Sequence, residues 1–109
     1  MDDSLYIYKL TPFLLEKLWG GTKLQTMYGK GDNSSCIAES WELSAHDAGP
    51  SKVCGGKYDG LSLKELIDAL GRGVMGEAAT DAVKFPLLIK FINAEKPLSI
   101  QIHPNDEYA

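Results

Sequence analysis

The run KPLSIQIHP, residues 96–104, alternates apolar and polar side chains. Such alternation is typical of a β-strand that turns one face to a core and the other face to a different environment. The apolar face would consist of Leu98, Ile100 and Ile102. The polar face would consist of Ser99, Gln101 and His103. This stretch therefore predicts a β-rich fold in which a hydroxyl, an amide and an imidazole project side by side.

Gln101 and His103 are two residues apart, so on a strand both side chains can reach one metal ion. They offer an oxygen and a nitrogen donor, and imidazole is a common zinc ligand. Two protein ligands do not close a zinc site, so the pattern indicates part of a metal site. The alternative is structural, because an alternating strand that ends at Pro104 can be a half-buried edge strand. A single histidine is by itself ambiguous between donor, acceptor and ligand.

Length and charge restrict the class of protein. A chain of 109 residues corresponds to one small domain. Its formal net charge of −4, without a cluster of Lys or Arg, argues against a nucleic-acid partner. No apolar run is long enough to span a bilayer, and the acidic start is not followed by the apolar core of a signal peptide. We therefore expect a cytoplasmic protein that binds neither nucleic acid nor membranes.

The two cysteines, Cys36 and Cys54, do not have the Cys-x-x-Cys spacing of zinc knuckles or redox motifs. They could meet across neighbouring strands. Cysteines this sparse are nevertheless more typical of reduced thiols in a cytoplasmic protein, which is what we expect here.

Segments rich in β-forming residues predict four strands, over residues 5–10, 36–44, 51–54 and 85–93. The last of these is expected to form a hairpin with the strand over 98–103. Ser62 and Glu65 form a capping-box pattern ahead of apolar residues at helical spacing, so a helix is expected to start after Ser62 and to end in a left-handed turn at Gly71. Residues 77–83 can add a second short helix. The expected fold class is mainly β with one or two short helices.

Four residues within the apolar segments could carry chemistry. Lys90 interrupts an apolar strand, so its ammonium either reaches solvent at a sheet edge or lines a pocket that binds an anion. Glu39 lies in an otherwise apolar strand face, and it either pairs with a core cation such as Lys90 or lines a pocket. Trp19 and Trp41 could form the floor of a sugar site, or they could be core residues.

The chain resembles the type I mannose-6-phosphate isomerases in their short bacterial form. Segments in the family's order carry the resemblance: Leu18–Gly21, Ala38–His46, Pro50–Val53, Phe85–Ile92 and Pro97–Ala109. The Gln-x-His-Pro run, together with the lysine-bearing strand before it, is the most specific of them. The resemblance covers nearly the whole chain.

The resemblance implies a cupin-type (jelly-roll) β-barrel, of which residues 1–109 would be the N-terminal portion, incomplete at its C-terminal end. It also implies zinc held by a Gln, a His, a Glu and a second His. Gln101 and His103 match the first two, and the others would lie beyond Ala109. Ser99 matches a serine near the substrate phosphate, and Lys90 matches a lysine of the active-site pocket.

Glu39, Trp41 and Trp19 match family segments that could line the same pocket, whereas the catalytic base is not identified. The implied reaction interconverts mannose 6-phosphate and fructose 6-phosphate by moving a proton between C2 and C1 through an enediol. Zinc can stabilise the developing negative charge as a Lewis acid. The implied partner is a small-molecule sugar phosphate, and activity would require the rest of the parent chain. Two alternatives remain, a non-catalytic sugar-phosphate-binding cupin and an interaction domain that pairs with another chain.

Overall fold

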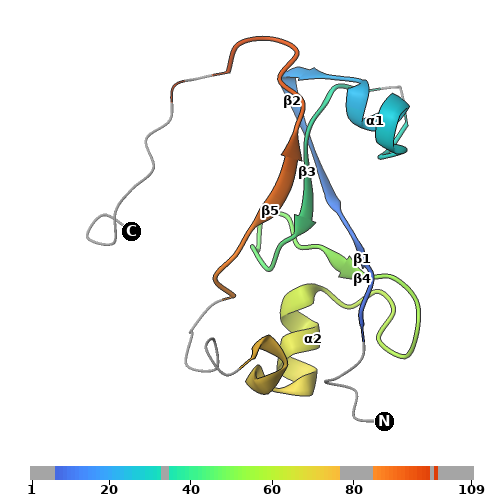
Figure 1. Ribbon diagram of the computed structural model, residues 1–109, viewed down its shortest axis with the longest axis vertical. Helices are drawn as coiled ribbons and strands as arrows, with labels where there is room; N and C mark the ends of the chain where they lie inside the picture. The colour runs from blue at the N-terminus through green and yellow to red at the C-terminus, as the bar shows by residue number, and fades with distance from the viewer. Residues whose placement is uncertain (1–6, 33–34, 77–84, 99, 101–109) are drawn as a thin grey trace.

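The computed structural model describes residues 7–32, 35–76, 85–98 and 100 (Figure 1). No helix in this part of the chain combines the length and the apolarity needed to cross a membrane. The elements, in chain order, are β1 (Leu10–Thr11), β2 (Phe13–Gly21), α1 (Lys23–Tyr28), β3 (Ile37–Leu43), β4 (Lys52–Val53), α2 (Leu63–Leu70), the 3₁₀ helix η2 (Arg72–Met75) and β5 (Ile89–Ile92).

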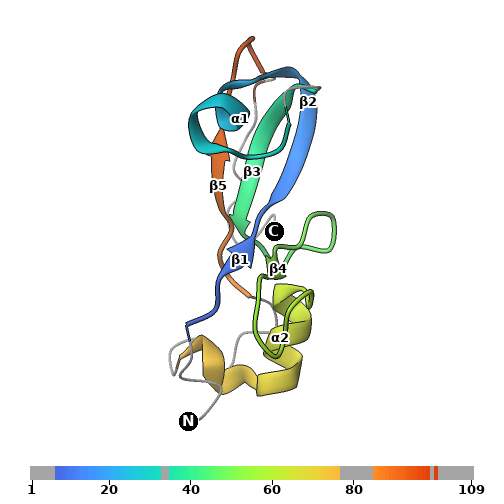
Figure 2. The same ribbon diagram turned by 90° about the vertical axis from the view of Figure 1, so that its right-hand side faces the viewer.

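β3 is the central strand of a three-stranded antiparallel sheet, with β2 and β5 on its two sides. Phe13 of β2 and Lys90 of β5 both pair with Trp41 of β3. β1 and β4 form a separate two-stranded antiparallel ladder. Figures 1 and 2 show α1 at one end of the three-stranded sheet and α2 at the other end, beyond β1 and β4. The described strands thus form two small antiparallel sheets.

The strand expected over residues 36–44 is confirmed as β3. Its first four residues, Ile37–Ser40, are all buried, because the neighbouring strands cover its edges and side chains cover both of its faces. The alternation of apolar and polar residues in this segment therefore distinguishes two faces that are both covered, and it does not distinguish a core face from a solvent face. Glu39 and Trp41 belong to one face, and Ser40 and Glu42 belong to the other.

The first strand does not have the bounds expected from the sequence, which were residues 5–10. β1 covers only Leu10–Thr11, residues 7–9 lie outside any strand, and residues 5 and 6 lie outside the described part of the chain. The pairing is short because the partner strand β4 has only two residues. Pro12, which has no N–H to donate to a ladder, separates β1 from β2. The long strand of this region is β2, which is not among the strands expected from the sequence.

The last expected strand, residues 85–93, is narrower in the structure, where β5 covers Ile89–Ile92. All four of its residues are exposed, although the apolar sequence suggested burial on both faces. Among the described strands β5 pairs only with β3, so in this part of the chain it is the edge strand of its sheet, and this position accounts for its exposure. The expected hairpin partner lies largely outside the described residues, which include only residues 98 and 100 of it, and it stays a prediction.

The expected capping box is confirmed at the start of α2. The Glu65 backbone N–H donates to the Ser62 hydroxyl (3.1 Å), and the Ser62 backbone N–H donates to the Glu65 carboxylate (3.0 Å). At the other end, Gly71 has a positive φ of 88° but a ψ of 157°, so the helix does not end in the expected left-handed turn. That turn occurs instead at Gly29, after α1, with φ 66° and ψ 27°. Residues 77–83 lie outside the described part of the chain.

The apolar core gathers around α2. Val53, Leu63 and Leu66 are its buried centre. Half-buried apolar residues from β1, the end of β3 and Phe85 pack against this centre, so α2 closes the end of the fold that contains the β1–β4 ladder. Cys36 and Cys54 are both exposed free thiols, as expected.

The capping box makes the stability of α2 depend on pH. The Ser62 backbone N–H, and secondarily its hydroxyl, hold the pKa of Glu65 below its ordinary value of 4.5. Because the folded-state pKa is depressed, the charged carboxylate stabilises the fold above pH 4.5, and this contribution is lost as pH falls through the folded-state pKa. We expect the stability advantage of the wild type over Glu65→Gln to shrink between about pH 6 and about pH 3, measured by urea unfolding. A difference that does not change with pH would contradict this account.

Gly20 lies where β2 and β3 approach most closely. A Cβ at this position would lie 2.6 Å from the Ala38 backbone nitrogen, and a strand backbone cannot move aside without breaking its ladder. We expect Gly20→Ala to lower the free energy of unfolding by about 2 kcal/mol or more. Gly73→Ala is the matched control, since a Cβ there meets nothing within 4 Å. Equal unfolding midpoints for the two variants in urea would show that the close approach is not required.

Candidate functional site

The seven residues singled out from the sequence divide into two groups. Three of them, Ser99, Gln101 and His103, lie outside the described residues, so their predicted roles are untested. The structure describes the other four, which are Trp19 on β2, Glu39 and Trp41 on β3, and Lys90 on β5. Among the described residues there is no group of three or more His, Cys, Asp or Glu that could hold a metal ion.

Glu39 and Lys90 form an ion pair across β3 and β5. The Lys90 ammonium lies 2.5 Å from a Glu39 carboxylate oxygen, and the two side chains are 34% and 10% exposed. Lys90 is paired in register with Trp41, two residues from Glu39 on the same face, so the contact is the diagonal one that a long side chain can make. The pairing expected as the structural role of Glu39 is thus confirmed. The buried carboxylate is neutralised by a lysine whose side chain remains partly exposed.

Trp41 completes this cluster from the strand that carries Glu39. The Lys90 ammonium lies 5.8 Å from the centre of the Trp41 ring, within the range of a cation–π contact. The Phe13 and His46 rings lie 6.1 Å and 5.7 Å from it, centre to centre. The Trp41 Nε1–H is buried without a hydrogen-bond partner in the part of the chain that the structure describes. Trp41 is therefore packed against its neighbours, and its ring also contacts the Lys90 ammonium.

His46 follows β3 and lies exposed at the turn after this strand. Its Nδ1 accepts a hydrogen bond from the Ala48 backbone N–H (3.0 Å), which fixes the orientation of the ring. The same ring meets Trp41 edge to face, with an interplanar angle of 79°. His46 thus buttresses Trp41, a role that spacing along the sequence did not indicate.

Trp19 lies at the opposite end of β2 from Phe13. It belongs to the irregular stretch between Glu16 and Gly21, where the pairing of β2 with β3 shifts its register. The Trp19 carbonyl accepts a hydrogen bond from the Lys96 backbone N–H (3.0 Å). The structure therefore places Trp19 beside the turn that follows β5, and it does not place Trp19 in the cluster of Glu39, Trp41 and Lys90.

The other face of β3 carries a second ion pair that sequence analysis missed. The Lys30 ammonium lies 2.5 Å from a Glu42 carboxylate oxygen, and the buried Ser40 hydroxyl donates to the other oxygen (2.8 Å). Lys30 also lies 5.5 Å from the centre of the Phe91 ring. The available signal was the placement of Glu42 on the face opposite Glu39, but nothing in the sequence pattern indicated that Lys30 would lie beside it.

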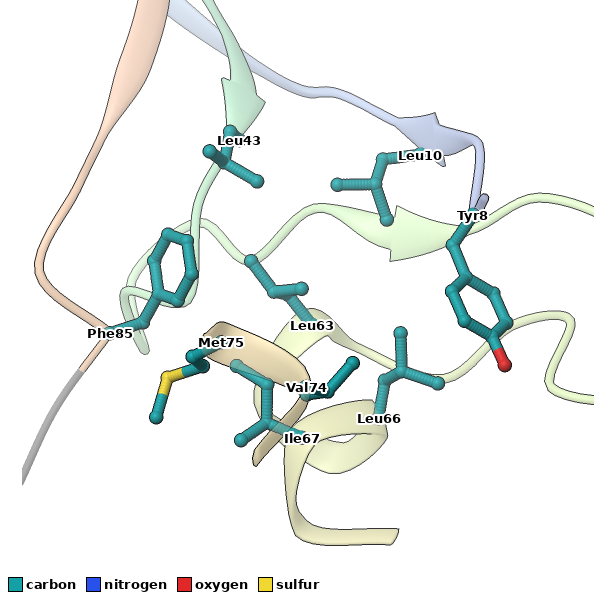
Figure 3. Close-up of a pocket in the computed structure, with 9 residues that line it drawn as sticks. All are labelled: Tyr8, Leu10, Leu43, Leu63, Leu66, Ile67, Val74, Met75 and Phe85. Atoms are coloured by element: carbon teal, nitrogen blue, oxygen red, sulfur yellow. The ribbon is translucent and has the colours of Figure 1, made fainter. Parts of the chain in front are cut away.

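The structure also contains an apolar pocket of about 240 Å³ at the end of the fold that holds α2 (Figure 3). Leu63, Leu66 and Ile67 of α2 line it together with residues of β1, β3 and η2, and with Phe85. None of the four described residues singled out from the sequence lines it. Its lining within the described part of the chain is apolar and brings no charges together, so the ion-paired cluster on the sheet is the candidate site.

The chain is similar to proteins of one family. Residues 7–109 match the family described as phosphomannose isomerase type I, catalytic domain. The chain is 42% identical over 98 residues to the mannose-6-phosphate isomerase ManA of Bacillus subtilis, and the match covers 90% of this chain. It is 37% identical over 90 residues to the mannose-6-phosphate isomerase of Escherichia coli, covering 80% of this chain and 23% of that protein.

The fold comparison agrees. The crystal structure of the mannose 6-phosphate isomerase from Bacillus subtilis matches with a TM-score of 0.83 and 40% identity, over 93% of this chain and 31% of that chain. Together with the antiparallel sheets and short helices, this confirms the expected fold class, mainly β and part of a cupin-type fold. The chain spans about three tenths of the length of the curated Bacillus subtilis relatives.

The burial of Glu39 makes its partner important for stability. We expect Lys90→Met to lower the free energy of unfolding of the full-length protein by about 2 kcal/mol, because a buried carboxylate is left without its cation. Adding Glu39→Gln to this variant should recover most of the loss. Urea unfolding measures both effects. Lys64→Met is the control, because its contact with Asp47 is exposed and long (3.9 Å) and such pairs contribute little. A Lys90→Met variant as stable as Lys64→Met would contradict the assignment.

Proposed function

The chain belongs to the type I phosphomannose isomerase family, and on that premise we propose that it forms the N-terminal part of a cytoplasmic, zinc-dependent isomerase that interconverts mannose 6-phosphate and fructose 6-phosphate. The relatives named above as mannose-6-phosphate isomerases support the activity. Because the chain covers about three tenths of its curated relatives, we assign the activity to the full-length protein and not to these residues alone.

The observation that carries this proposal is that the Lys90 side chain is partly exposed although it pairs with a buried acid. A lysine used only to neutralise a buried acid can be buried with it, yet the Lys90 side chain is 34% exposed while that of Glu39 is 10% exposed. An ammonium has three donors, and Glu39 takes one of them. A partly exposed lysine with donors left over could attract and orient an anionic sugar phosphate, with Glu39 holding the side chain in place.

The metal part of the proposal concerns Gln101, His103 and Ser99. Gln101 and His103 would supply an oxygen and a nitrogen donor to zinc, and the remaining ligands would come from elsewhere in the full-length protein. When bound, zinc would supply Lewis-acid stabilisation of the negative charge that develops during the isomerisation. Ser99, which shares their strand face by sequence, would contact the substrate phosphate through its hydroxyl.

The proposal is tested on the full-length protein by measuring its zinc content and its isomerase kinetics with mannose 6-phosphate. His103→Ala and Gln101→Ala should lower both zinc occupancy and kcat/KM, since each removes a proposed zinc ligand. A protein that binds the sugar phosphate but does not isomerise it, with or without added zinc, would support the non-catalytic alternative and overturn the proposed activity.

Lys90→Met should lower kcat/KM by about tenfold, equivalent to about 1.4 kcal/mol of transition-state stabilisation. Lys30→Met is a closely matched control, because Lys30 also pairs with a glutamate of β3 and also lies over an aromatic ring, but on the opposite face of the sheet. Both variants should lose stability, and only Lys90→Met should lose activity. Equal kinetics for the two variants would remove Lys90 from the site.

A further inference from the structure

Lys90 lies on a strand that does little to hold it. All residues of β5 are exposed, and among the strands that the structure describes β5 pairs only with β3. A lysine side chain has four rotatable bonds and loses about 2 kcal/mol of conformational entropy when it is fixed in one arrangement. Its ammonium can serve an anionic substrate efficiently only if something fixes it before the substrate arrives.

Glu39 alone does not fix the ammonium in direction. The ion pair is a single contact to one carboxylate oxygen. A cation tied at one point can still swing about that point, towards solvent or towards the sheet. A second contact on another side of the ammonium would remove this freedom, and the Trp41 ring provides it at 5.8 Å.

Trp41 is itself held from several sides. Phe13 is its register partner on β2, and the two rings are in contact. His46 meets it edge to face from the turn after β3. The Gly49 backbone lies so close that a Cβ there would be 2.8 Å from the Trp41 ring. A ring packed in this way is a rigid platform for the ammonium.

From this arrangement we infer that Trp41 is a positioning residue, which acts on the proposed reaction through Lys90. The Trp41 ring would hold the Lys90 ammonium against Glu39, so that the N–H donors not used by Glu39 are left for the substrate. The expected effect on kinetics rests on the proposed function, whereas the packing of Lys90 against Trp41 does not depend on it. Tryptophan is the most effective side chain for a cation–π contact, so the identity of residue 41 matters beyond its size.

A double-mutant cycle in the full-length protein tests whether Trp41 acts through Lys90. Trp41→Leu should lower kcat/KM by about fivefold to tenfold in the wild-type background and by less than about twofold in a Lys90→Met background. Trp41→Phe, which keeps a ring face but loses the Nε1–H, should recover most of the activity lost in Trp41→Leu. The cycle of Phe91→Leu with Lys30→Met is the matched control and should leave kcat/KM unchanged. Fully additive losses for Trp41 and Lys90 would overturn the inference.

Nuclear magnetic resonance of the full-length protein provides a readout that is independent of activity. Protons that lie over an aromatic face are shifted upfield, so the Cε protons of Lys90 should be upfield of those of exposed lysines such as Lys64. The shift should disappear in Trp41→Leu and persist in part in Trp41→Phe. If the wild type lacks isomerase activity but shows this shift, the proposed function fails and the positioning geometry stands. A Lys90 signal that Trp41→Leu does not change would overturn the inference.

Discussion

The burial of the Glu39 carboxylate in the central strand is the constraint on which the rest of the structure depends. A charged group taken out of water must find a partner, and the cost of leaving it alone is several kcal/mol. The partner is Lys90, which comes from β5, about 50 residues later in the sequence. The ion pair therefore selects which strand lies beside β3 and in which register, because a one-residue shift would turn Lys90 to the other face of the sheet.

β3 meets the same requirement on its other face. Glu42 projects there and is paired with Lys30, while the buried Ser40 hydroxyl donates to its second oxygen. Each acid is thus joined by a lysine that lies over an aromatic ring, Trp41 in one case and Phe91 in the other. The two arrangements hold β3 from both sides. A strand fixed in this way is a suitable base for a site whose side chains must keep their positions.

Glycines allow the strands around this base to approach closely. Gly20 lies against the Ala38 backbone, and a Cβ on Gly21 would meet the Asn93 and Glu95 side chains at 2.9 Å and 2.6 Å. These contacts bring the end of β2 against the turn after β5, where the Lys96 N–H donates to the Trp19 carbonyl. That turn leads into the segment with Ser99, Gln101 and His103. The backbone of Trp19 and the close approach at Gly21 therefore hold Lys96, three residues before Ser99, against the end of β2.

The sequence by itself determined the elements whose signals are local. The capping box starts α2 because Ser62 and Glu65 are three residues apart, and the alternation of residues 36–44 is enough to define β3. Recognisable segments also identified the family, and charged residues within apolar strands pointed to Glu39 and Lys90. Only the tertiary structure decided that the residues of β5 are exposed, that β1 is limited by its two-residue partner, and that Lys30 reaches Glu42. The physical reason is that exposure, pairing length and ion-pair partners depend on which segments become neighbours in space, and no local pattern contains that information.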